Sequence, residues 1–151
     1  MISILNHEDA QTARQIRSIQ LPAYQVEAGI LQTDRIPRLY DSIEDIQSCE
    51  ETFVGFFRGD VLVGFISYKR KANLVDIHRL VVFPPYFRQG IAKSLLTSLL
   101  DILPSSTFKV STGKNNMAAQ RLYHSLGFQK ESDSEAEPGL WLTHFKRTPK
   151  L

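Results

Sequence analysis

The chain has 151 residues, of which 42% are hydrophobic and 23% charged, a composition typical of one globular domain with a single core. The formal net charge of +2 is too small to indicate a nucleic-acid-binding surface, and the one cysteine, Cys49, excludes an internal disulfide. No apolar run reaches the ~18 residues of a membrane-spanning helix, and the first residues lack the pattern of a secretory signal. We therefore expect a single domain over residues 1–151, located in the cytoplasm, with neither a membrane nor nucleic acid as partner.

The N-terminal segment predicts one short strand followed by helices. Residues 2–5 form the strand, and Asn6 can cap a helix that begins at about Glu8. We expect Pro22 to end this helix, because proline lacks the N–H group that an interior helical position uses. The pattern predicts two further helices, at residues 24–31 and 42–50.

The central segment predicts a β-hairpin and a third strand. Two β-rich runs, at residues 53–57 and 61–68, flank the tripeptide Arg58-Gly59-Asp60, which is typical of a tight turn. The same tripeptide occurs in adhesion ligands, but a strand on each side favours the turn. The third strand is expected at residues 74–82.

The remaining elements alternate between helix and strand. Residues 90–103 predict an amphipathic helix whose buried face holds Ile91, Leu95, Leu99, Ile102 and Leu103. The next strand, at 107–111, should run parallel to the strand at 74–82, since a right-handed crossover helix joins them. A helix at 116–126, followed by Gly127 as its C′ residue, and strands at 128–131 and 140–146 complete the chain. We expect an α/β fold with a mixed, largely antiparallel sheet of six to seven strands and helices on both faces.

The segment that joins the strand at 74–82 to the following helix has the features of an anion site. The strand ends before Pro84-Pro85, and a loop with Arg88 and Gly90 leads into the helix. Backbone N–H groups of a first helical turn have no intrahelical partner, and the helix dipole adds positive charge there. Neither a P-loop nor a dinucleotide-binding glycine pattern is present. The segment therefore predicts a site for a phosphorylated ligand of another kind.

Two motifs in this region resemble those of the GNAT N-acetyltransferases. The loop reads FRQGIA, where the family has [RQ]-x-x-G-x-[GA]: Gly90 and Ala92 fit, and Phe87 stands where Arg or Gln is usual. The family pattern N-x-x-A-x-x-L-Y-x-x-x-G-F follows, and every fixed position matches, at Asn116, Ala119, Leu122, Tyr123, Gly127 and Phe128. The resemblance extends over about residues 52–128. With Phe87 at this position, the side-chain contact that Arg or Gln makes in the family is lost. Binding of the ligand by backbone amides would not depend on that contact.

The resemblance implies the GNAT acyl-CoA N-acyltransferase fold, acetyl-CoA as cosubstrate and no metal. It implies transfer of an acetyl group to a primary amine, of a small molecule or a peptide, by direct attack in a ternary complex. The amides around the pyrophosphate would be those of Arg88, Gln89, Gly90, Ile91 and Ala92, and the strand backbone along the pantetheine arm that of Leu80, Val81 and Val82. Asn116 either contacts the cofactor, caps its helix, or does both.

The resemblance also suggests which residues move protons. Tyr123 matches a tyrosine that protonates the departing thiolate in many members, although a tyrosine on an amphipathic helix can equally serve packing. Asp76 and His78 match positions of the general base, and the period of a strand places both on one face with Leu80. Each of the two side chains is a candidate base, each can instead be a structural polar group, and a water chain is the third option.

Other properties stay open at this point. Tyr24, Glu27, Tyr40 and Asp41 lie in the region that shapes the acceptor pocket in the family, but their spacing indicates no particular amine. A CoA-binding regulatory or scaffold protein without turnover is the alternative function. A homodimer is compatible with the resemblance, since dimers are common among such proteins.

Overall fold

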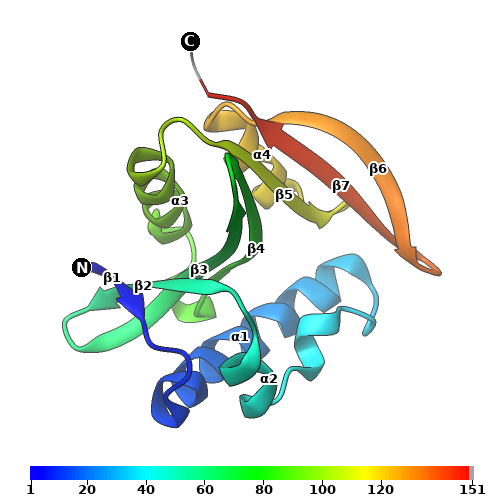
Figure 1. The fold of residues 1–151 in the computed structure, drawn as a ribbon. Helices are drawn as coiled ribbons and strands as arrows, with labels where there is room; N and C mark the ends of the chain where they lie inside the picture. The colour runs from blue at the N-terminus through cyan, green and yellow to red at the C-terminus, as the bar shows by residue number, and fades with distance from the viewer. Residues whose placement is uncertain (150–151) are drawn as a thin grey trace.

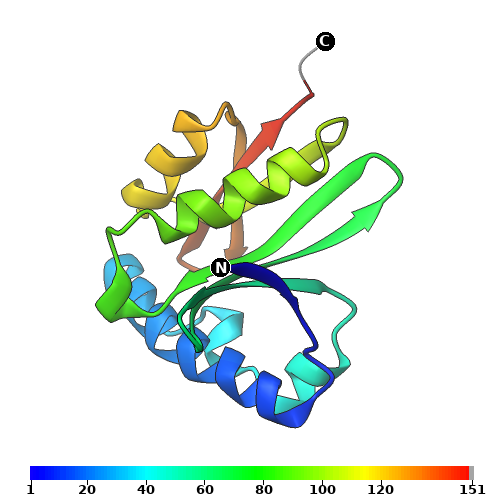
Figure 2. The same ribbon diagram turned by 90° about the vertical axis from the view of Figure 1, so that its left-hand side faces the viewer.

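The computed structural model describes residues 1–149, which form one seven-stranded sheet with helices on both faces (Figures 1 and 2). The strands are β1 (Ile2–Leu5), β2 (Thr52–Arg58), β3 (Val61–Lys71), β4 (Leu74–Val82), β5 (Thr107–Gly113), β6 (Gln129–Glu137) and β7 (Leu140–Arg147). The helices are α1 (Ala10–Leu31), α2 (Ile43–Ser48), α3 (Ile91–Ile102) and α4 (Met117–Ser125), with short 3₁₀ turns η1 (Pro37–Tyr40) and η2 (Pro84–Tyr86).

The sheet has the strand order β1-β2-β3-β4-β5-β7-β6. Neighbouring strands are antiparallel except β4 and β5, which pair in parallel because α3 crosses between them. This confirms the predicted mixed, largely antiparallel sheet and its one parallel pair. The hairpin turn after Arg58 is confirmed as well, since β2 and β3 pair directly on either side of it.

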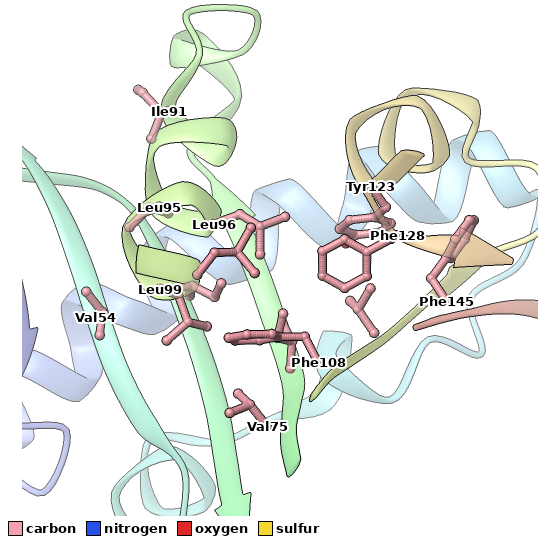
Figure 3. Packing of buried hydrophobic residues seen from close by; sticks show 14 of the residues in the cluster. Val54, Val75, Ile91, Leu95, Leu96, Leu99, Phe108, Tyr123, Phe128 and Phe145 are labelled. Carbon is pink, nitrogen blue, oxygen red and sulfur yellow. The ribbon is translucent and has the colours of Figure 1, made fainter. Parts of the chain in front are cut away.

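Two hydrophobic clusters lie on opposite faces of the sheet. Helices α3 and α4 cover the first, in which leucines of α3 pack against Val75 and Phe108 of the strands (Figure 3). Helices α1 and α2 cover the second, which is centred on Phe53 and Phe65. The predicted buried face of α3 is wrong at its end. Leu96 is fully buried, whereas Ile102 is 64% exposed. The buried face of α3 includes Leu96 and Leu100, and Ile102 lies at the edge of this face in the last turn of the helix.

Helix α1 corrects two predictions for the N-terminal segment. The N-cap is Asp9 and not Asn6, and the Asp9 carboxylate accepts a hydrogen bond from the Thr12 N–H at 3.0 Å. Pro22 lies inside the helix instead of ending it. Apolar side chains on both sides of the proline, such as Ile19 and Ala23, pack on the sheet, and this packing offsets the cost of ~3 kcal/mol for an interior proline.

The last hairpin is longer than predicted. Strand β6 continues to Glu137, although its sequence alternates acidic and small residues with little hydrophobicity. Its pairing with β7 supplies the hydrogen bonds, and acidic side chains on an edge strand oppose further pairing with other chains.

Candidate active site

The site lies where β4 and β5 separate. The two strands pair only between Leu74–Asp76 and Thr107–Lys109, and beyond Asp76 their paths diverge. Helix α1 lies on one side of the sheet here, and α3 and α4 lie on the other (Figure 1). Residues of α1, β4 and α4 line two cavities at this gap. The backbone of β4 beyond Asp76 thus has a pairing edge that β5 does not cover.

The larger cavity has a volume of about 500 Å³ and is mostly apolar. It runs from the second half of α1, past the end of β4 and the N-terminus of α3, to α4. Of the residues predicted to bind the cofactor, all except Gln89 line it: Leu80, Val81, Val82, Arg88, Gly90, Ile91, Ala92 and Asn116. Phe87, the departure from the family motif, lines it too and adds apolar surface there.

The N-terminus of α3 opens onto this cavity. Gly90 is the N-cap with φ 76°, and Arg88 before it also has a positive φ of 63°. The first intrahelical bond runs from the Ser94 N–H to the Gly90 carbonyl at 2.9 Å, so the N–H groups before Ser94 have no acceptor inside the helix. A Cβ at residue 90 would meet no protein atom within 4 Å, so the space beside Gly90 is open. These features suit an anion.

A smaller cavity of about 100 Å³ adjoins the first and is mostly polar. His78 and Arg79 of β4 face Ser111 and Thr112 of β5 across it. Six residues line both cavities and mark the boundary between them: Tyr24, Glu27, Leu80, Asn116, Ala119 and Tyr123. A ligand that fills the larger cavity can therefore meet a second ligand at this boundary.

Tyr123 belongs both to the core and to this boundary. Its ring packs against Phe128 and Phe145, with ring centroids 5.7 and 5.6 Å away, and the residue is only 4% exposed (Figure 3). Burial and, second, the negative charge of Glu27 raise the pKa of the Tyr123 phenol. The phenol is therefore held in its protonated form, as a proton donor must be. The packing role is confirmed, and the donor role stays a prediction with which this position is compatible.

Asn116 has the predicted capping role, and its contact with a cofactor stays a prediction. Its Oδ1 accepts a hydrogen bond from the Ala119 N–H at 3.3 Å and so caps α4. The same side chain lines both cavities.

A β-bulge in β4 changes the predicted arrangement of the candidate bases. Arg79 pairs with Ser67 and Ile77 pairs with Tyr68, so His78 is an extra residue between two ladder positions. The bulge shifts the alternation, and Leu80 packs against the cluster covered by α3. The prediction that Leu80 shares a face with Asp76 and His78 is therefore wrong.

The two candidate bases lie together but differ in access to the site. His78 Nε2 is 3.6 Å from Asp76 Oδ2, and His78 Nδ1 is 3.9 Å from Glu51 Oε2. His78 lines the smaller cavity, whereas the Asp76 side chain is 56% exposed and lines neither cavity. His78 and Tyr123 thus line the same cavity, whereas Asp76 lies outside it and contacts His78.

A buried ionic network supports the β4 bulge, and the sequence analysis missed it. Arg79 is 2% exposed, and its guanidinium lies 3.3 Å from Asp41 Oδ2 and 3.4 Å from Glu51 Oε1. Gln20 Nε2 donates to Asp41 Oδ2 at 2.8 Å, and Ser67 Oγ donates to Glu51 Oε1 at 2.6 Å. One feature of the sequence could have indicated this network. Arg79 lies between Ile77 and Val81, in a strand whose other buried positions are apolar.

Glu27 is the second residue whose place the sequence did not reveal. It lies in the half of α1 that follows Pro22, and its side chain lines both cavities. Burial raises the pKa of the Glu27 carboxyl, and the Asn116 side chain partly offsets this by hydrogen bonding to it. Burial and then the Glu27 charge likewise raise the pKa of Tyr24. Of the other acceptor-region candidates, Tyr40 and Asp41 line neither cavity.

Residues 1–149 hold no group of three or more His, Cys, Asp and Glu side chains placed to bind a metal ion. Over the same range, none of the helices combines the length and apolar composition required to cross a membrane.

Similar structures share this architecture. The PaiA N-acetyltransferase of Thermoplasma acidophilum, solved in complex with coenzyme A, superimposes with a TM-score of 0.75. The two chains are 18% identical, and the match covers 95% of this chain and 98% of that one. At this identity the likeness shows the fold.

Sequence comparisons assign the family. UPF0157 protein YqkA of Bacillus subtilis is 40% identical over 151 residues, which cover 99% of this chain and 44% of that protein. The N-alpha-acetyltransferase RimI of Mycobacterium tuberculosis is 31% identical over 90 residues, 57% of each chain. This chain thus spans about half the length of these curated relatives. The model of the Acetyltransferase (GNAT) family matches residues 13–128, and the chain belongs to that family.

Proposed function

We propose that this chain is an acetyl-CoA-dependent N-acetyltransferase that transfers an acetyl group to a primary amine by direct attack in a ternary complex. One observation carries the proposal. The cavity that begins at the α3 N-terminus ends at a boundary with a second, polar cavity, and the Tyr123 phenol lies at that boundary. A cofactor site and an acceptor site that meet at a proton donor are what acyl transfer from a thioester to an amine requires.

The diphosphate of CoA would bind at the N-terminus of α3. The free N–H groups before Ser94 and the helix dipole favour an anion there, and Arg88 adds a full positive charge. The pantetheine arm would then follow the edge of β4 along Leu80, Val81 and Val82, where β5 does not pair with β4. Amide groups of the arm can pair with this backbone as a short strand would.

The chemical step needs a polarised carbonyl and a proton for the leaving sulfur. A backbone N–H near Val82 would polarise the acetyl carbonyl, an effect typically worth ~3–4 kcal/mol in the transition state. The neutral amine attacks the carbonyl carbon, the C–S bond breaks, and Tyr123 gives its proton to the thiolate. The raised pKa of Tyr123 supports this role, because the phenol is protonated at neutral pH.

The acceptor would enter from the polar cavity. A small-molecule amine and a peptide amine are both compatible with that cavity, and the mycobacterial relative is described as an N-alpha-acetyltransferase. Peptide α-amines therefore belong in any first panel of acceptors, beside polyamines and amino acids.

The alternative is a CoA-binding protein without turnover. It shares the cofactor cavity but does not require a tyrosine that lines both cavities. An acetyl-CoA turnover screen against amine classes, with free thiol as the readout, separates the two. Thiol release with at least one amine class supports the enzyme, and CoA binding without thiol release across the whole panel supports the silent protein.

A further inference from the structure

The boundary between the two cavities contains one carboxylate. Six residues line both cavities, and Glu27 is the one among them whose ordinary side-chain pKa makes it ionised at neutral pH. The others are two tyrosines, an asparagine, an alanine and a leucine. Glu27 reaches this position because α1 continues through Pro22 and its second half passes over the gap between β4 and β5.

The surroundings of Glu27 suit proton transfer better than a fixed ion pair. No described salt bridge involves the Glu27 carboxylate within residues 1–149. The neutral residues Tyr24, Asn116 and Tyr123 line the same two cavities as Glu27, and the Glu27 charge contributes to the raised pKa values of the two tyrosines. Burial raises the pKa of Glu27 and so moves it toward the neutral range in which a general base is most effective.

The two bases suggested by the sequence are placed less well. Asp76 lines neither cavity and is largely in solvent. His78 lines only the polar cavity, and its two ring nitrogens face the carboxylates of Asp76 and Glu51 at 3.6 and 3.9 Å. Neither side chain reaches the larger cavity in which the thioester would lie.

We propose that Glu27 accepts the proton of the incoming ammonium group and so generates the amine nucleophile. This inference rests on the proposed acetyltransferase function. It also assigns the acceptor class, because a carboxylate at the meeting point attracts amines that arrive as cations.

The substrate R–NH₃⁺ gives one proton to the Glu27 carboxylate, and the nitrogen lone pair forms a C–N bond to the acetyl carbon. The tetrahedral adduct collapses, the C–S bond breaks, and the thiolate takes the proton of Tyr123. The second proton lost by nitrogen restores the phenol. The Glu27 proton passes to solvent, so one amide, one thiol and one released proton result.

Other ionisable groups face the same region and define the controls. Tyr24 lies on α1, Tyr123 on α4, His78 and Arg79 on β4, and Arg88 and Lys93 at the start of α3. Tyr24 and Tyr123 have raised pKa values, and Arg79 lies within a buried ionic network. His78 is the other candidate base in this region, so a His78 variant is the matched control.

The test compares Glu27→Gln, which keeps the size and hydrogen bonding of the side chain, with His78→Gln and with the exposed control Glu50→Gln. Each variant is assayed with the best basic amine from the thiol-release screen and with hydroxylamine, which is already neutral at pH 7. We expect Glu27→Gln to lower kcat with the basic amine by ~10²–10⁴-fold. We expect a much smaller loss with hydroxylamine, unchanged affinity for CoA, and no acidic limb in the pH profile.

The outcomes separate the two proposals. Glu27→Gln turnover close to that of the unmodified protein, an equal loss with both amines, or an acidic limb abolished by His78→Gln alone would each overturn the role of Glu27 while leaving the acetyltransferase intact. If the unmodified protein releases no thiol with any amine, the function itself fails and the inference falls with it. Should Glu27→Gln not fold in a urea titration, Glu27→Asp replaces it, with a smaller loss expected on the basic amine only.

Discussion

The guanidinium of Arg79 lies 3.3 Å from the Asp41 carboxylate, and this contact joins strand β4 to the segment between η1 and α2. Arg79 is the residue next to the β4 bulge, and Asp41 directly follows the 3₁₀ turn that packs beside α1. Glu51 approaches the same guanidinium from the start of β2 at 3.4 Å. The ionic network therefore holds three chain segments around the wall of the polar cavity.

Replacing Arg79 should destabilise the fold strongly. Arg79→Met fills a similar volume but removes the buried cation beside Asp41 and Glu51, which then have only the more exposed Arg38, 3.7 Å from each carboxylate. Loss of one partner from a buried ion pair typically costs ~3–5 kcal/mol of unfolding free energy. Urea unfolding measures this loss, and Arg121→Met on the exposed side of α4 should change stability by less than ~0.5 kcal/mol. Similar values for the two variants would show that the network contributes little.

Gly90 should matter for the ligand beyond its effect on stability. Its φ of 76° disfavours a Cβ, and Gly139 in the β6–β7 turn offers a matched control with φ 83° and equally open surroundings. Both Gly90→Ala and Gly139→Ala should cost ~1–2 kcal/mol of stability. Only Gly90→Ala should also weaken CoA binding, by about tenfold or ~1.4 kcal/mol, because its Cβ enters the cavity at the α3 N-terminus. Calorimetric titration of both variants with CoA checks this, and equal affinities would remove Gly90 from the ligand site.

The Tyr123 phenol should be needed for turnover and dispensable for folding. Tyr123→Phe keeps the ring that packs on Phe128 and Phe145, so we expect stability to change by less than ~1 kcal/mol. Loss of the proton donor should lower kcat by ~10²–10⁴-fold with CoA affinity unchanged. Tyr68→Phe, a tyrosine of β3 that lines neither cavity, is the control. Full activity in Tyr123→Phe would leave this residue a packing role alone.

The pH dependence of activity follows from two raised pKa values. Glu27 must be ionised to accept a proton, so kcat/KM should fall as the pH drops through the raised pKa of this carboxyl, which lies above its ordinary ~4.3. Tyr123 must be protonated, and its raised pKa moves the alkaline limb above the ordinary ~10 of tyrosine. Steady-state rates from pH 4.5 to 9 measure the acidic limb. An acidic limb that persists unchanged in Glu27→Gln would contradict the assignment.

The same raised pKa has a consequence for stability. The folded state disfavours the ionised Glu27, so this residue lowers stability above the folded pKa and has no such effect below the unfolded one. Glu27→Gln should therefore raise the unfolding free energy at pH 7 relative to the unmodified protein, and the gain should vanish near pH 4. Urea titrations at the two pH values test this. A loss of stability at pH 7 would indicate that the carboxylate makes favourable contacts in the folded state.

The sequence predicted β4 and the start of α3 well because local patterns determine them. The bounds of β4 were correct at both ends, since Leu74 and Val82 delimit an apolar run stopped by Pro84-Pro85. Gly90 stands at the helix start, as its place before an amphipathic segment indicated. Such features depend on a few adjacent residues and therefore appear in the sequence itself.

The surroundings of the polar cavity could not be predicted to the same degree because distant contacts determine them. Helix α1 continues through Pro22 only because both halves pack on the sheet, and the place of Glu27 depends on that continuation. The bulge at His78 arises from pairing with Ser67 and Tyr68 on another strand, and no pattern within β4 marks it. The sequence therefore identified the polar residues of β4 but not the face of the sheet on which each side chain lies.

Calorimetric titration with CoA, and in parallel with pantetheine, tests the central claim most directly, because pantetheine lacks the diphosphate assigned to the α3 N-terminus. The proposed site predicts saturable binding of one CoA per chain and a much weaker interaction with pantetheine, with the difference reduced about tenfold in Gly90→Ala. No heat with CoA, or equal affinity for the two compounds, would contradict it.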